Sequence, residues 1–88
     1  MPEVQVVFFK RSDEKIPIKD WMDDLAKKDR RKCLERVERL REDGHELDRP
    51  FAAYLKDGIY ELRVKSGNVN YRMLYFFHEG RAVVITHG

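Results

Sequence analysis

The sequence has one cysteine, no long apolar run and almost no net charge, and each of these excludes a class of protein. Cys33 has no second cysteine within the 88 residues, so intrachain disulfides are excluded and a reducing cytoplasm is expected. No apolar run approaches the length of a membrane-spanning helix and no signal-peptide pattern begins the chain, so no membrane partner is expected. The formal charge of +2 is too small to indicate a nucleic-acid partner, so the positions of the charges must carry that argument.

The chain is rich in charged (39%) and hydrophobic (42%) residues, which suits one small globular domain over residues 1–88. Apolar spacing and turn residues predict, in order, a strand, two helices and three strands. The expected ranges are 4–9, 17–25, 29–43, 59–65, 71–78 and 81–87. This order predicts an α+β fold, β-α-α-β-β-β, with an antiparallel sheet and a helical hairpin packed on one face. Asp29 is the expected N-cap of the second helix.

Two arginines are predicted to lie side by side on neighbouring strands. Pairing counted back from the loop at residues 66–70, with Lys65 opposite Asn70, sets Arg63 directly opposite Arg72 on the same sheet face. Neighbouring guanidiniums repel each other and stabilise a sheet poorly. They suit a phosphate, because each offers planar, bidentate donors.

The next hairpin extends this row if neither strand carries a bulge. Its Glu-Gly tip would pair Leu74 with Ile85 and Arg72 with His87. Both arginines and His87 would then form one line across three strands. Glu61 shares that face one row along.

Side chains alternate along the three later strands, which assigns their residues to the two faces of the sheet. The face expected to pack on the helices carries Tyr60, Leu62, Val64, Tyr71, Met73, Tyr75, Phe77 and Val84. The opposite face carries Ile59, Glu61, Arg63, Lys65, Arg72, Leu74, Phe76, Val83, Ile85 and His87. Because charged groups there mix with aliphatic and aromatic ones, this face is interpreted as a binding surface.

Several segments give the chain a family resemblance: the helix around Trp21, the run RPFAAYLKDGIYELRV at residues 49–64, NYRMLYFF and VVITHG. Together they resemble the RelE/ParE toxin superfamily, and within it the HigB-like, phage-derived branch. The resemblance implies a small antiparallel sheet with a helical hairpin on one face. It also implies cleavage of messenger RNA in the ribosomal A site, and a cognate antitoxin, usually with a helix-turn-helix DNA-binding domain.

By the same resemblance, Arg63 matches a basic position of the second strand, and Arg72 matches the arginine that lies against the scissile phosphate. Glu61 stands where the best-known branch has a lysine. Relatives usually continue, past the position of Gly88, into an aromatic residue, a basic run and a final helix, which this sequence lacks.

The residues themselves could support metal-independent RNA cleavage by attack of the 2′-hydroxyl. Arg63 and Arg72 would stabilise the phosphorane, and His87 or Glu61 would act as acid or base. Lys56 and Lys65 are candidates for contacts to flanking phosphates. An alternative for Arg63 is a plain ion pair with Glu61 or with another acid.

No cofactor or metal is expected, because His45, His78 and His87 lack ligand spacing with acids or with Cys33. Cys33 lies among apolar residues and is expected to be a small buried hydrophobe rather than a catalytic thiol.

Two functions remain open from the sequence. One is a ribosome-dependent mRNA endonuclease toxin. The other is a non-catalytic binding protein of the same fold, either directed at gyrase or a decayed toxin that binds only its antitoxin. In either case a strip of half-covered apolar residues predicts a partner, an antitoxin segment or a second copy of the chain. The strip consists of Leu74, Phe76, Val83 and Ile85.

Overall fold

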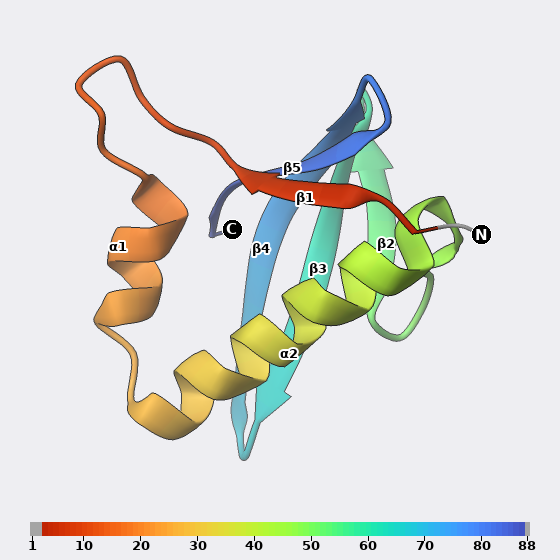
Figure 1. Cartoon of the computed structure of the whole chain (residues 1–88). Coiled ribbons are helices and arrows are strands. Elements are labelled where there is room, and N and C mark those ends of the chain that lie inside the picture. Colours follow the sequence, from red (N-terminus) through yellow and green to blue (C-terminus); the bar gives the residue numbers. More distant parts are fainter. Residues whose placement is uncertain (1–2, 88) are drawn as a thin grey trace.

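The computed structural model describes residues 3–87, apart from the His87 side chain, and confirms an α+β fold (Figure 1). The elements are β1 (Gln5–Phe8), α1 (Pro17–Asp23), α2 (Lys27–Asp43), the 3₁₀ turn η1 (Gly44–Glu46), β2 (Ala52–Lys56), β3 (Ile59–Ser66), β4 (Val69–His78) and β5 (Arg81–His87).

The five strands form one mixed sheet in the order β1-β5-β4-β3-β2, so the expectation of a fully antiparallel sheet is wrong. β1 runs parallel to β5, with Val7 opposite Val83, and the other neighbouring strands are antiparallel. The meander β2 to β5 pairs each strand with the next, so β1 is added at the outer edge of β5. Its pairing partner is therefore the last strand of the chain, as Figure 1 shows.

β2 is a strand that the predicted order omitted. It joins β3 through a tight turn at Asp57 and Gly58, whose φ angles are 53° and 81°. Two consecutive positive φ angles are typical of a hairpin turn that favours Asp-Gly. The Asp57-Gly58 dipeptide was therefore the sequence signal from which β2 could have been predicted.

Residues at the helix ends explain where α1 begins and where α2 ends. Pro17 is the first residue of α1, as predicted, because its fixed φ suits the first turn and it has no N–H to satisfy. α2 begins at Lys27 and ends at Asp43, and Gly44, with φ 55°, is its C-cap as predicted. The prediction that Asp29 caps this helix is wrong, because Asp29 lies inside the first turn and its carboxylate binds the β3–β4 hairpin instead.

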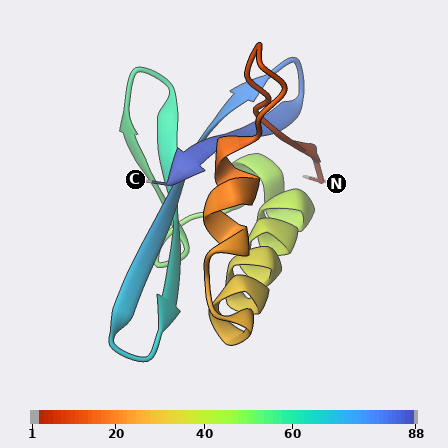
Figure 2. The same cartoon turned by 90° about the vertical axis from the view of Figure 1, so that its left-hand side faces the viewer.

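Both helices lie on one side of the β3–β4 hairpin (Figure 2), and the core fills the space between the two layers. Its fully buried members include Ile18, Cys33, Leu40, Leu62, Met73, Tyr75 and Val84. Every residue predicted for the helix-facing side of the sheet is either in this core or packed against it. Two-residue alternation thus assigned that face correctly.

The pairing of β3 with β4 agrees with the prediction, and that of β4 with β5 agrees from His78–Arg81 to Phe76–Val83 but not at Leu74. Arg63 lies opposite Arg72, as expected. A bulge in β5 leaves Ile85 as an extra residue, so that Leu74 pairs with Thr86 rather than Ile85. The bulge follows Val84, the last β5 residue paired with β1.

The bulge also changes the partner of His87, which pairs with Met73. The predicted pairing of His87 with Arg72 is therefore wrong. The His87 side chain lies outside the described residues. The three-member line across the sheet is thus reduced to the arginine pair.

Candidate phosphate-binding site

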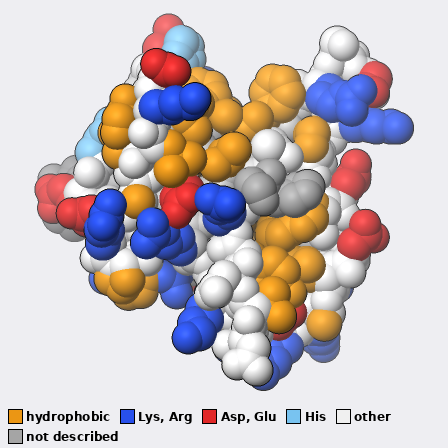
Figure 3. All heavy atoms as spheres, turned by 180° about the vertical axis from the view of Figure 1, so that it is seen from behind, with side chains coloured by type: hydrophobic (Ala, Val, Ile, Leu, Met, Phe, Trp, Pro, Cys, Tyr) orange, Lys and Arg blue, Asp and Glu red, His pale blue; other side chains and the backbone are white. Residues whose placement is uncertain are grey.

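Arg63 and Arg72 extend from the face of the sheet that points away from the helices, because their neighbours along the two strands face the core. Figure 3 shows the molecule from this side. On this face basic and acidic side chains share the surface with hydrophobic ones. The two guanidiniums come from directly opposite positions, and their side chains are 44% and 58% exposed. Both can therefore reach a ligand from solvent.

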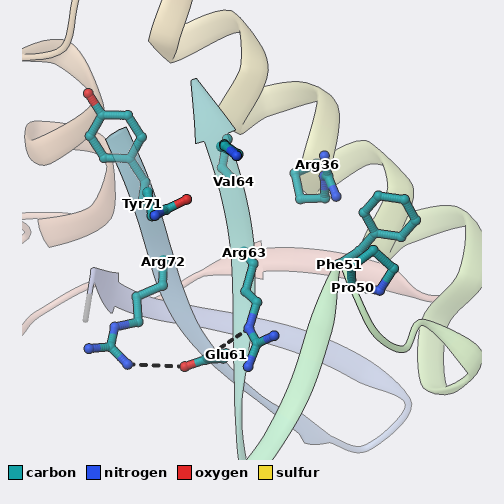
Figure 4. A pocket seen from close by; sticks show the side chains of 10 residues that line it. Arg36, Pro50, Phe51, Glu61, Arg63, Val64, Tyr71 and Arg72 are labelled. Atoms are coloured by element: carbon teal, nitrogen blue, oxygen red, sulfur yellow. Dashed lines mark hydrogen bonds and ion pairs between the residues drawn. The ribbon is translucent and has the colours of Figure 1, made fainter. Parts of the chain in front are cut away.

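A single carboxylate bridges the two arginines, as Figure 4 shows. Glu61 Oε1 accepts a hydrogen bond from Arg63 Nε at 2.6 Å, and Oε2 accepts one from Arg72 Nη1 at 3.2 Å. The Glu61 side chain is only 7% exposed. The ion pair of Arg63 with Glu61 that the sequence left as an alternative is therefore present, and Arg72 shares it.

The bridge keeps Glu61 ionised. The hydrogen bond from Arg63 is the main influence lowering the pKa of Glu61 below its ordinary value, and Arg72 adds to it. A carboxylate whose pKa is lowered in this way is a weak base. It is better described as an anion held between two guanidiniums.

The bridge uses only part of each guanidinium. Each carries five N–H donors. Within residues 3–87, no acid other than Glu61 pairs with either arginine. Both Nη groups of Arg63, and the Nε and Nη2 groups of Arg72, remain available to a ligand.

A cavity of about 610 Å³ surrounds this cluster and extends around one edge of β3. Successive strand residues point to opposite faces, yet Arg63, Val64 and Lys65 all line it. This is because β2 pairs with β3 only as far as Leu62, so the edge of β3 beyond Leu62 is open and both of its faces can be reached from the cavity. On the helix side the cavity is lined by Arg36 of α2, whose guanidinium lies 4.2 Å from the centroid of the Phe51 ring.

The structure gathers some of the predicted site residues and separates others. Glu61, Arg63, Lys65 and Arg72 line one cavity. Lys56 is exposed at the end of β2 and is not among the residues lining that cavity. Arg36 was missed, because the sequence of α2 alternates basic and acidic residues and only helix–sheet packing distinguishes Arg36 from its neighbours.

Beside the cavity, one carboxylate ties the β3–β4 hairpin to α2. Asp29 accepts hydrogen bonds from the Ser66 hydroxyl and, at 2.7 Å, from the Tyr71 hydroxyl. These bonds lower the pKa of Asp29 and raise that of Tyr71. Because Tyr71 directly precedes Arg72, the network fixes the strand that presents one of the two guanidiniums.

Replacing Asp29 with asparagine is expected to lower the thermal midpoint by about 4 °C, because one of the two hydroxyls loses its acceptor. Thermal unfolding followed by circular dichroism would measure the change. Asp20→Asn is a matched control, since Asp20 is an exposed acid in the first turn of α1. Equal shifts in the two variants would show that the helix-end charge, and not the hydroxyl network, is responsible.

Cys33 is fully buried, and burial raises the pKa of its thiol to about 11. The prediction that Cys33 is a small buried hydrophobe is therefore confirmed, and a raised thiol pKa disfavours the reactive thiolate. Within residues 3–87, no group of three or more His, Cys, Asp or Glu side chains could hold a metal ion. No helix in that range is long and apolar enough to cross a membrane.

Comparison with known families gives a match over most of the chain. The model for the phage derived protein Gp49-like (DUF891) matches residues 20–88, which include α2 and all of β2 to β5. The chain belongs to this family. The Gp49-like family is RelE/toxin-like and is associated with the toxins of toxin–antitoxin systems. A search of curated proteins finds no significant match.

Proposed function

We propose that this Gp49-like protein is the toxin of a type II toxin–antitoxin system of the HigB-like branch, and that it cleaves messenger RNA on the ribosome in the bacterial cytoplasm. The observation that carries the proposal is the pair of exposed guanidiniums opposite each other in an open cavity. Membership in a toxin-like family supports the same function. A protein that needed this pair only for stability would gain little from it, because like charges directly opposite each other on neighbouring strands are destabilising.

In the proposed mechanism the scissile phosphate displaces the Glu61 carboxylate and binds between Arg63 and Arg72. The 2′-hydroxyl of the preceding ribose attacks this phosphate. The new bond joins the 2′-oxygen to phosphorus as the bond from phosphorus to the 5′-oxygen breaks; solvent water takes the proton of the 2′-hydroxyl and supplies the one on the leaving 5′-oxygen, and the product ends in a 2′,3′-cyclic phosphate. The guanidiniums stabilise the negative charge that develops on the phosphorane. His87, which the sequence suggested as acid or base, pairs with the core residue Met73 rather than with Arg72, so the mechanism assigns it no proton transfer at the arginine pair.

The apolar strip on the outer face is the proposed docking surface for an antitoxin that carries a helix-turn-helix domain. Leu74, Phe76, Val83 and Ile85 are each half-buried, so none is covered completely by the chain itself. A second copy of this chain is the alternative occupant.

The presence of Glu61 favours one alternative function, a non-catalytic protein of the same fold that binds only its antitoxin or acts on gyrase. A carboxylate already neutralises part of the arginine pair. Substrate phosphate must therefore compete with an internal anion, which a protein that has lost catalysis could tolerate.

Induced expression in bacteria, followed by mapping of messenger RNA ends, separates the two functions. The nuclease predicts growth arrest together with new RNA ends in a fixed phase relative to codons. Growth arrest without such ends would support the non-catalytic alternative and would reject the nuclease. Co-expression of the proposed antitoxin should abolish both effects.

A further inference from the structure

The free edge of β3 faces a groove that leads away from the arginine pair. The amide of Arg63 points away from β4, since it donates to the Phe51 carbonyl at 2.7 Å. Two residues further, the backbone of Lys65 points the same way, but no strand among the described residues lies beside it. This edge therefore borders open space, and α2 forms the other side of the groove.

A second cavity of about 500 Å³ lies along this groove and continues the first. The two cavities share Arg36, Val64 and Lys65 as lining residues. They therefore meet around the edge of β3. Each has the volume of a small-ligand site, which suits part of a single strand of nucleic acid but not a duplex.

The positive charge of the chain is concentrated here. Six basic and three acidic side chains line the two cavities, which gives a formal charge of +3, whereas the whole chain carries +2. The rest of the molecule thus has no positive excess. The basic lining residues are Lys32, Arg36, Arg39, Arg63, Lys65 and Arg72.

Among the lining cations Lys32, Arg36 and Lys65 have no ion pair with a described carboxylate, and of these three only Arg36 and Lys65 line both cavities. Arg63 and Arg72 bind Glu61, and Arg39 binds Asp43 at 2.7 Å. Neither Arg36 nor Lys65 has an ion pair with any described residue. Arg36 is instead held over the Phe51 ring, and burial is the main cause that lowers the pKa of its guanidinium. An anion from outside the chain would offset that cost.

We propose that Arg36 and Lys65 form a second phosphate subsite, which binds a neighbouring phosphate of the RNA strand held by Arg63 and Arg72. The inference rests on the proposed function and adds the path of the substrate, from the outer face of the sheet, around the edge of β3 and along α2. A strand that spans both subsites gains affinity from each. A ligand with one phosphate uses only the arginine pair.

Binding of uncleavable 2′-O-methyl oligouridylates of two lengths tests this subsite. The dinucleotide with one phosphodiester and the hexanucleotide with five would be titrated by calorimetry. Arg36→Ala is expected to weaken hexanucleotide binding about fivefold and to leave dinucleotide binding unchanged. The dependence of log K on log salt should become less steep by about 0.7 for each lost phosphate contact.

Two further variants keep the test decisive. Lys65→Ala should reproduce the length-dependent loss without disturbing Phe51, because Lys65 is exposed. Arg31→Ala is the control, an exposed arginine of α2 that is not among the lining residues of either cavity. Equal losses for both oligonucleotides, or none for either, would overturn the subsite. Tighter binding of hexaglutamate than of the hexanucleotide would assign the groove to an acidic protein and would overturn it too.

Failure of the proposed function would look different. Arg72→Ala would then leave RNA cleavage unchanged, whereas the comparison of the two oligonucleotides would still report whether Arg36 and Lys65 bind phosphate.

Discussion

Replacing Arg72 with alanine is expected to reduce messenger RNA cleavage by about 10²–10³-fold, because it removes a donor that stabilises charge on the transition state. The Arg72 side chain is 58% exposed and its single acid partner lies at 3.2 Å. Its loss should therefore leave the fold intact. Primer extension on a translated message would measure cleavage, and circular dichroism would confirm folding.

Two further variants, one conservative and one a control, test this prediction. Arg72→Lys keeps the charge but loses the planar pair of donors, so activity should fall between those of alanine and arginine. Arg81→Ala is the matched control, because Arg81 is an exposed arginine of β5 in the His78–Arg81 pair at the far end of the sheet. Unchanged cleavage in Arg72→Ala, or an equal loss in Arg81→Ala, would contradict the role given to the arginine pair.

Replacing Glu61 with glutamine is expected to tighten binding of the uncleavable hexanucleotide about tenfold. The carboxylate now satisfies one donor group of each arginine and repels an incoming phosphate. Glutamine retains the shape and one acceptor oxygen but removes the negative charge. Calorimetric titration against the wild-type protein would measure the gain.

Glu79→Gln is the control for this change, since Glu79 is an exposed acid at the tip of the β4–β5 turn. It alters net charge by the same amount away from the cavity. An equal gain in both variants would mean that overall charge alone sets affinity. Weaker binding by Glu61→Gln would mean that the carboxylate holds the arginines in place for the substrate rather than competing with it.

The same carboxylate gives stability a dependence on pH whose sign is fixed by its pKa. Because the arginines lower the pKa of Glu61 from its ordinary 4.5, the ion pairs stabilise the fold fully above that value. This contribution is lost as the pH falls through the lowered pKa. The difference in thermal midpoint between wild type and Glu61→Gln should therefore shrink in acid. A difference that stays constant from pH 7 to well below pH 4.5 would contradict the bridge.

The pairing of Arg63 with Arg72 could be predicted from sequence because it depends only on a short loop and on two-residue alternation. Both act over a few neighbouring residues, and neither strand has a bulge between the loop and the arginines. The burial of Tyr75 and Val84 followed from the same alternation.

Other features depend on contacts between distant segments, and the sequence does not reveal them. The parallel pairing of β1 with β5 joins the two ends of the chain. The extra residue Ile85 changes the register after Val84, and no local signal marks it. Asp29 resembles a helix cap, yet it binds residues 37 and 42 positions away. Arg36 joins the cavity only because α2 crosses beside the free edge of β3.

The position of Glu61 is the most consequential of these differences. Alternation placed it on the correct face, but not between the guanidiniums. The sequence offered Glu61 both as a base and as an ion-pair partner. The lowered pKa and the two hydrogen bonds favour the second role.

Nuclear magnetic resonance of the arginine Nε–H groups, during titration with the uncleavable hexanucleotide, tests most directly whether Arg63 and Arg72 bind phosphate in place of Glu61. The account predicts that the Nε–H signals of both arginines shift with the same dissociation constant that calorimetry gives, while the Arg81 signal stays in place. Saturable binding that leaves both signals unmoved would contradict it.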